Sequence, residues 1–154
     1  MNYTYPSTLR TANQLETLDH VMMFASPLPG PASSLPALTD PADTNASLDN
    51  RARAYLHTNC AQCHRPGGPT PSSMDLRYTT ALANTNACNV TPLLGQVGIP
   101  NGLLIAPGEP ARSIVIERTS RRDVHGMPPL GSNIVDTAGI ILLTNWINGL
   151  ANCN

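Results

Sequence analysis

The sequence contains no lysine, and its nine basic residues are all arginine. Charged residues make up only 12% of the chain and the formal net charge is −1, so the basic surface expected of a nucleic-acid-binding protein is missing. Lysine ammonium groups steer many diffusing redox proteins toward acidic partners. Without them, docking to a redox partner should depend on shape and apolar contact, or on tethering to that partner or assembly with it.

Long apolar runs are missing as well. No segment approaches the roughly 20 apolar residues that a helix needs to span a bilayer, which predicts a chain with no transmembrane segment. The start, MNYTYPSTLR, lacks the charged and then apolar regions of a secretory leader. We therefore expect either that a leader has been removed or that the chain belongs to a longer one. Its 154 residues fit one domain with an appendage and are too few for a large α/β enzyme.

Residues 1–46 are predicted to form an N-terminal arm. Up to about residue 25, Leu15, Leu18 and Met22 recur at helical spacing, and Thr11 is in position to cap that helix. Residues 26–46 contain five prolines, which favours a linker or an extended wrap over regular structure. The predicted helix has few apolar positions, so the arm should lie on something else.

Residues 47–154 are predicted to form a compact, mainly α domain. Ser47 can cap a helix that ends at Cys60, with its apolar residues on one face and Arg53 pointing away. Asp136 can cap a C-terminal helix with an apolar stripe. Helices should therefore bracket this region at both ends.

The middle of this region is predicted to be rich in loops, because glycine and proline cluster in PGGPTP, GIPNG, APGEP and GMPPLG. One short helix is expected in PARSIVIERTS. Pro110 suits a first helical position there, and Ala111, Ile114 and Val115 would then share a face. The β-branched residues of this segment leave a strand as the alternative.

Cys60, Cys63 and His64 form a C-x-x-C-H motif in the stretch NCAQCHRPGG. A structural zinc site needs a second pair of ligands at short spacing, and the other two cysteines stand alone. A thioredoxin-like pair would follow a strand, whereas this one follows a predicted helix. Covalent haem attachment explains the spacing, because two thiols add across the two porphyrin vinyl groups and the adjacent histidine becomes the proximal iron ligand. We expect one haem c, attached through Cys60 and Cys63.

Met127 is the best candidate for the second axial ligand. It precedes two prolines in HGMPPLG, which favour an extended backbone, and Gly126 would let the chain approach the porphyrin. A methionine that fills a gap in the core is the alternative. Among the weaker candidates, a histidine would give a lower reduction potential. These candidates are Met22, Met23, Met74, His20, His57 and His125.

These features resemble the single-haem c-type cytochrome domain found alone or fused to periplasmic dehydrogenases, a class I-like type with CxxCH and a methionine in an MPP loop. The resemblance rests on NCAQCH, IAPGEPARSIVIERT, MPPLG and VDTAGIILLTNWING and covers about residues 47–150. It implies a small cytochrome c-like helical fold around one covalent haem, in which His64 and Met127 bind the iron. It also implies that Trp146 packs near the crossing of the first and last helices.

The resemblance further implies a role for arginine at the haem. In the segment PGEPARSIVIERT, Arg112 or Arg118 would pair with a haem propionate, since the guanidinium group suits bidentate carboxylate recognition. A solvated arginine is the alternative.

Covalent haem attachment implies an oxidising compartment, periplasmic or extracellular in a bacterium, where disulfides persist. In that setting Cys88 and Cys153 are best interpreted as a disulfide that ties the loop after the haem motif to the chain end. Two unpaired thiols are the alternative.

The sequence thus predicts an electron carrier rather than an enzyme. Its partners would be redox proteins, a donor and an acceptor. One alternative is a cytochrome subunit of a dehydrogenase complex or a cytochrome polymer, docking through residues 1–46 as a homo- or hetero-assembly. Peroxidase activity needs an open distal position, and Met127 argues against it.

Overall fold

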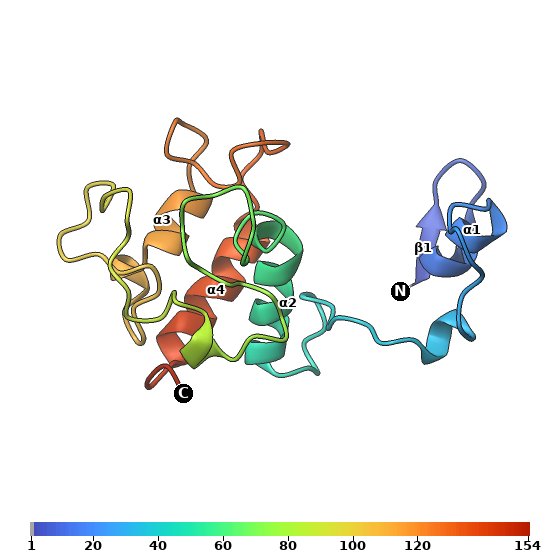
Figure 1. The fold of residues 1–154 in the computed structure, drawn as a ribbon, viewed down its shortest axis with the longest axis horizontal. Coiled ribbons are helices and arrows are strands. Elements are labelled where there is room, and N and C mark those ends of the chain that lie inside the picture. The colour runs from blue at the N-terminus through green and yellow to red at the C-terminus, as the bar shows by residue number, and fades with distance from the viewer. Residues whose placement is uncertain (1) are drawn as a thin grey trace. The chain divides into compact units, whose positions relative to one another are not determined.

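A computed structural model describes residues 2–154 of the chain, which divides into two compact units, Met1–Leu38 and Thr39–Asn154 (Figure 1). No helix in the described part is both long enough and apolar enough to cross a membrane. Three short 3-10 turns lie at Ala32–Ser34, Leu82–Asn84 and Pro110–Arg112. The other elements of residues 2–154 are β1 (Asn2–Tyr5), β2 (Arg10–Asn13), α1 (Gln14–His20), α2 (Leu48–Cys60), α3 (Ile114–Thr119) and α4 (Thr137–Gly149).

The first unit begins with a β-hairpin where the sequence predicted the start of a helix. β1 and β2 pair antiparallel with Thr4 opposite Thr11, and the two hydroxyl oxygens lie 2.7 Å apart. Threonine favours the pleated surface of a strand, so Thr11 pairs across the sheet instead of capping a helix. The helix starts later, at Gln14, where Asn13 is the N-cap and its side chain accepts a hydrogen bond from the Leu15 N–H at 3.0 Å.

The first unit has little apolar interior of its own. No residue of α1 is buried, and Val21, Met22 and Met23 just after it are exposed. Between residues 26 and 46 the only helical segment is the 3-10 turn Ala32–Ser34, as expected where prolines interrupt the chain.

The core of the second unit lies where α2 packs beside α4 (Figure 1). Both predicted N-caps are confirmed, because the Ser47 side chain accepts from the Asn50 N–H at 3.2 Å and the Asp136 side chain from the Gly139 N–H at 3.0 Å. These caps satisfy backbone donors that have no partner inside their helices. The ends of both helices are therefore fixed by local contacts.

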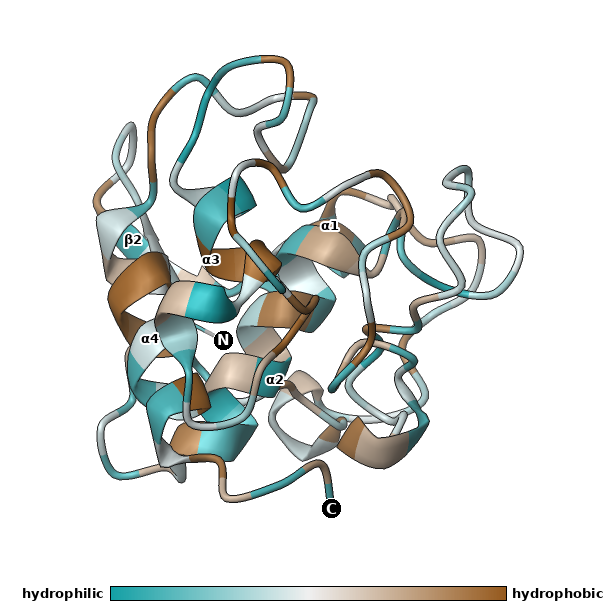
Figure 2. Ribbon diagram, turned by 90° about the vertical axis from the view of Figure 1, so that its left-hand side faces the viewer, coloured by the Kyte–Doolittle hydropathy of each residue, from teal (hydrophilic) through white to brown (hydrophobic). Residues whose placement is uncertain are grey.

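Leu56 of α2 and Leu143 and Ile147 of α4 are fully buried in this core. Figure 2 shows the hydrophobic residues, in brown, that α4 carries among hydrophilic ones. Trp146 is also buried, and its indole N–H donates to the Asp49 carboxylate at 2.8 Å. This hydrogen bond joins α4 to the first turn of α2 and places the tryptophan where the two helices meet.

The short helix predicted from Pro110 is confirmed. The 3-10 turn Pro110–Arg112 leads into α3, and the junction residue Ser113 is fully buried. The Ser113 hydroxyl accepts from the Ala106 N–H at 2.9 Å and so ties the junction to the preceding loop.

The predicted fold class, a mainly α cytochrome c-like helical domain, is wrong. Helical residues make up about 31% of the chain, and a two-stranded sheet accompanies the four α-helices of the described part. Residues 61–109 contain no α-helix because glycine and proline interrupt them. Isolated bridges hold part of this segment instead, such as that between Cys88 and Ile105. The protein is a small mixed α/β chain with a loop-rich second unit.

Arg53 also departs from the prediction, since it is buried rather than pointing away from the core. Its guanidinium donates to the carbonyl oxygens of Arg77 and Tyr78, each at 3.4 Å, and to that of Thr80. A buried guanidinium needs such acceptors. The loop carbonyls provide them, and Arg53 thereby fastens this loop to α2.

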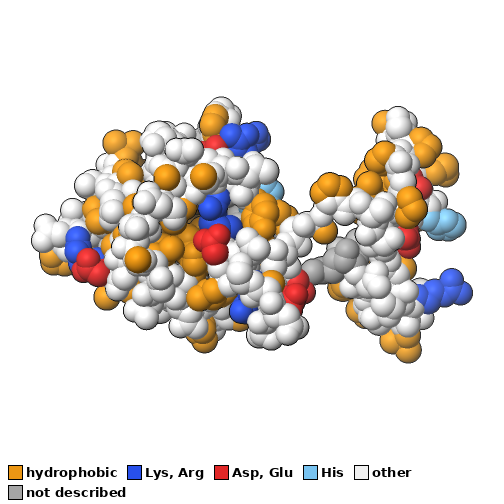
Figure 3. Space-filling model, turned by 90° about the horizontal axis from the view of Figure 1, so that it is seen from below, with side chains coloured by type: hydrophobic (Ala, Val, Ile, Leu, Met, Phe, Trp, Pro, Cys, Tyr) orange, Lys and Arg blue, Asp and Glu red, His pale blue; other side chains and the backbone are white. Residues whose placement is uncertain are grey.

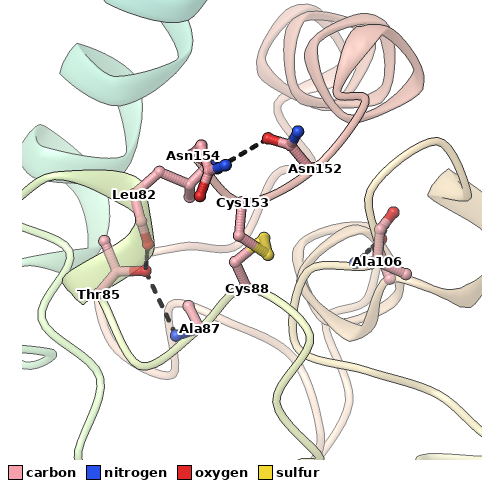
Figure 4. The surroundings of a disulfide bond; sticks show 9 residues. Leu82, Thr85, Ala87, Cys88, Ala106, Asn152, Cys153 and Asn154 are labelled. Atoms are coloured by element: carbon pink, nitrogen blue, oxygen red, sulfur yellow. Dashed lines mark hydrogen bonds between the residues drawn. A yellow bond between two sulfur atoms is a disulfide. The ribbon is translucent and has the colours of Figure 1, made fainter.

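A disulfide joins Cys88 to Cys153 across a sequence separation of 65 residues (Figure 4). Just before Cys88, the Ala87 N–H donates to the Thr85 hydroxyl oxygen at 3.3 Å, and this hydroxyl donates to the Leu82 carbonyl at 2.7 Å. The pair is the one expected from the sequence. It ties the loop at residue 88 to the segment after α4.

Replacing both cysteines, as in Cys88→Ser/Cys153→Ser, should lower the free energy of unfolding by about 4 kcal/mol, because the unfolded chain regains the entropy of a loop of this length. Denaturant unfolding of the variant and of the unchanged protein measures the difference. Alkylation of the denatured, unreduced protein should leave Cys88 and Cys153 unmodified. Alkylation of both would contradict the disulfide.

Candidate cofactor site

The C-x-x-C-H motif folds as a tight turn at the end of α2. The Cys60 carbonyl accepts hydrogen bonds from the N–H groups of Cys63, at 3.1 Å, and of His64, at 2.8 Å. This turn brings the histidine back beside the end of the helix. The thiols of Cys60 and Cys63 are both free.

Glycine is required directly after the motif. Gly67 has a positive φ of 71°, and the Gly68 N–H donates to the Arg65 carbonyl at 2.9 Å. A Cβ atom on Gly68 would overlap the Cys63 carbonyl. The Pro-Gly-Gly sequence therefore allows the chain to turn back tightly against the motif.

Residues 75–80, in the loop after the motif, form hydrogen bonds that fix the backbone of His64 and of this loop. The Leu76 N–H donates to the His64 carbonyl at 2.9 Å, and the Asp75 N–H donates to the Thr85 carbonyl at 2.8 Å. The Asp75 carboxylate accepts hydrogen bonds from the Arg77 guanidinium at 2.7 and 2.8 Å and from the Thr80 hydroxyl at 2.8 Å. These bonds lower the pKa of Asp75 well below its usual range, with Arg77 as the main cause.

The His64 side chain lies against an apolar cavity of about 250 Å³. Cys60 and Met127 line the same cavity, and most of the remaining wall consists of leucine, isoleucine, valine and proline side chains. Leu93 and Leu94 line it while being 70% and 67% exposed, so the cavity opens to the surface beside them. Such a cavity suits a flat apolar group that is held by a few polar contacts.

A second cavity of about 100 Å³ lies beside the motif. Charged side chains are scarce in both cavities, with Arg118 in the larger and Arg122 in the smaller. The shared wall shows that the two cavities belong to one site. The residues that line both are Cys60, His64, Thr70, Thr119 and Met127.

Met127 is held in the site by its backbone, since its N–H donates to the Arg118 carbonyl at 2.8 Å. The preceding Gly126 has a different role from the one the sequence suggested. A Cβ atom there would lie 2.6 Å from the Arg121 carbonyl, so glycine is needed for a close approach to the chain itself.

Arg118 connects two loops that border the larger cavity. Its guanidinium donates to the His125 carbonyl at 3.1 Å and to the Leu94 carbonyl at 3.5 Å. The other arginine considered from the sequence, Arg112, pairs with Glu109 at 2.7 Å and lines neither cavity. Of the two, Arg118 is the one placed at the site.

Two of the candidate ligands for the second iron position, Met127 and Met74, lie at the site. Met74 lines the larger cavity, as Met127 does. His57 is engaged elsewhere, because its Nδ1 accepts from the Tyr78 N–H at 3.1 Å. His125 lines neither cavity. The remaining candidates, His20, Met22 and Met23, belong to the first unit.

Burial changes the ionisation of the motif. The pKa of the Cys60 thiol is raised to about 12, mainly by burial and to a smaller extent by the charge of the neighbouring Cys63. Burial also lowers the pKa of His64, which favours the neutral imidazole. A neutral imidazole is the form that binds a metal.

Several residues of the site were not singled out from the sequence, among them four with polar side chains. Thr70 and Thr119 line both cavities, and Tyr55 and Arg122 line the smaller one. Tyr55 fits because Gly139 of α4 faces it, where a Cβ atom would overlap the tyrosine ring. A glycine within the apolar stripe of a helix was the available signal for this contact.

Protonation of Asp75 in acid should lower the free energy of unfolding. Because its pKa is lowered by folding, the ionised carboxylate stabilises the native state above the ordinary value near 3.8, and this stabilisation is lost as the pH falls below it. Asp75→Asn should cost about 1.5–3 kcal/mol at pH 7, and the difference from the unchanged protein should narrow below pH 4. Denaturant unfolding between pH 7 and pH 2 measures this. Asp123→Asn, which alters an exposed ion pair with Arg121, should cost less, and an equal cost would contradict the assignment.

Comparison of the chain with family models, with curated proteins and with solved structures found no match.

Proposed function

We propose that the chain is a monohaem c-type electron carrier in which Cys60 and Cys63 would hold the haem and His64 and Met127 would bind its iron. The observation that supports this most is the convergence of Met127 on the cavity of Cys60 and His64. Met127 is 63 positions beyond His64 in the sequence, so the fold and not the motif brings them together.

The chemistry of the site fits a covalent haem. Two free thiols at C-x-x-C spacing match the two vinyl groups of the porphyrin, and the neutral imidazole beside them matches iron. The apolar wall suits the porphyrin face. A zinc site fits less well, since residues 2–154 contain no group of three or more His, Cys, Asp or Glu side chains placed to hold a metal ion.

A haem held by Cys60, Cys63, His64 and Met127 would supply one-electron redox chemistry between a donor and an acceptor protein. The chain's residues would determine how easily this happens. The Met127 thioether favours the reduced state relative to a second histidine, and the apolar wall keeps water away from the site. The hydrogen bond from the Met127 N–H to the Arg118 carbonyl would fix the backbone from which the thioether side chain extends.

The partners would be redox proteins that dock by shape and apolar contact, in a periplasmic or extracellular compartment. Figure 3 supports the manner of docking, because hydrophobic side chains in orange are common on the face it shows while arginine and acidic side chains are few. The Cys88–Cys153 disulfide supports the compartment, since such bonds persist under oxidising conditions.

The full chain, produced in a bacterial periplasm with haem attachment, should give a pyridine haemochrome spectrum of one haem c per chain. Cys60→Ala/Cys63→Ala should abolish covalent haem, because no thiol remains to form a thioether. Cys88→Ser/Cys153→Ser removes the same number of sulfur atoms elsewhere and should retain it. A protein without covalent haem, or equal loss in both variants, would refute the proposal.

Met127 and Met74 can be separated by the near-infrared sulfur-to-iron band of the ferric protein. Met127→Ala should abolish the band and lower the midpoint potential, because the thioether ligand is lost. Met74→Ala changes the same cavity by the same chemistry and should keep the band. The reverse result would assign the ligand to Met74 instead.

A further inference from the structure

Two polar atoms of the cofactor site have no hydrogen-bond partner. They are Nδ1 of His64 and the hydroxyl oxygen of Thr70, and both are buried. Buried polar groups in proteins are almost always paired, and an unpaired one costs about 1–3 kcal/mol. Within residues 2–154 no other buried side-chain nitrogen or oxygen atom lacks a partner.

The two residues belong to the same wall of the site. Both His64 and Thr70 line the larger cavity and the smaller one. The turn at Gly67 and Gly68, which reverses the chain after the motif, connects them. The fold therefore returns a hydroxyl group to the neighbourhood of the imidazole.

The hydroxyl groups of Thr119 and Ser72, which also line the site, each have a hydrogen-bond partner. Thr119 also lines both cavities, but its hydroxyl donates to the carbonyls of Val115, at 2.8 Å, and Ile116, at 3.1 Å. Ser72, in the larger cavity, accepts from the Met74 N–H at 3.3 Å. The unpaired state is thus particular to Thr70.

We propose that Thr70 is a positioning residue for His64, whose Nδ1–H donates a hydrogen bond to the Thr70 hydroxyl oxygen once the site is loaded. This inference rests on the proposed haem-binding function. A neutral imidazole has one donor and one acceptor nitrogen, so a proton held on Nδ1 leaves the Nε2 lone pair for the iron. One hydrogen bond satisfies both unpaired atoms.

This hydrogen bond would also affect the electronic properties of the site. A histidine ligand that donates its second N–H to an oxygen becomes more basic and keeps a fixed ring orientation. A more basic ligand stabilises ferric iron relative to ferrous iron. Loss of the Thr70 hydroxyl should therefore raise the midpoint potential.

The test uses the haem-loaded full chain and three variants, Thr70→Val, Thr70→Ser and Thr119→Val. The midpoint potential is measured by redox titration, and solvent exchange of the Nδ1 proton of His64 by NMR of the 15N-labelled reduced protein. Thr70→Val should raise the midpoint potential. It should also increase the rate of solvent exchange of the His64 Nδ1 proton about tenfold, as expected for the loss of one hydrogen bond. Thr70→Ser should restore both values. Thr119→Val should change both values less than Thr70→Val does, because the Thr119 hydroxyl donates to carbonyls of its own helix.

Unchanged values in Thr70→Val would overturn the inference while the proposed function stood. An equal shift in Thr119→Val would also overturn it, since the effect would then come from the polarity of the cavity in general. A wild-type chain without haem c in the pyridine haemochrome spectrum would refute the proposed function and this inference together. If Thr70→Val fails to take up haem, Thr70→Ala compared with Thr70→Ser gives the same contrast.

Discussion

The cofactor site depends on one backbone oxygen, the carbonyl of Cys60. This atom lies at the end of α2 and accepts hydrogen bonds from the N–H groups of both Cys63 and His64. Leu56, one turn earlier in the same helix, is buried in the core together with Leu143 of α4. The packing of the two helices therefore fixes where the motif turns and where its imidazole lies. A site supported in this way keeps its geometry better than one carried by loops alone.

The opposite wall of the site comes from loops, and hydrogen bonds hold those loops where regular structure is missing. Arg118 joins the loops at Leu94 and His125 through its side chain and holds Met127 through its backbone carbonyl. α3 thus contributes this arginine to the site together with the side chains of Ile114, Val115 and Thr119. A rigid helix pair with functional residues on supported loops is a common division of labour in proteins.

Several local features were predictable from the sequence, whereas most distant contacts were not, with the Cys88–Cys153 disulfide as the exception. The N-caps at Ser47 and Asp136 follow from short-range hydrogen bonding, and the helix after Pro110 follows from a fixed φ angle. The mainly α fold class failed because Asn2–Tyr5 and Arg10–Asn13 pair as strands, which placed Thr11 in a sheet. The burial of Arg53 was missed because the loop carbonyls to which it donates are distant in the sequence, where no local pattern reveals them. The roles of Thr70 and Thr119 depend on which hydroxyl finds a partner after folding. For Thr70, that outcome is set by the tertiary fold and by no local sequence pattern.

The four cysteines raise a question of selectivity, since any two thiols in an oxidising compartment could combine. The thiolate is the reactive form in disulfide exchange, and burial raises the pKa of the Cys60 thiol, so that the thiol form dominates at neutral pH. The fold thereby makes this thiol slow to attack a disulfide. It also pairs Cys88 with Cys153, so that neither remains free to trap a cysteine of the motif. The fold thus leaves the two thiols of the motif free and joins the other two cysteines to each other.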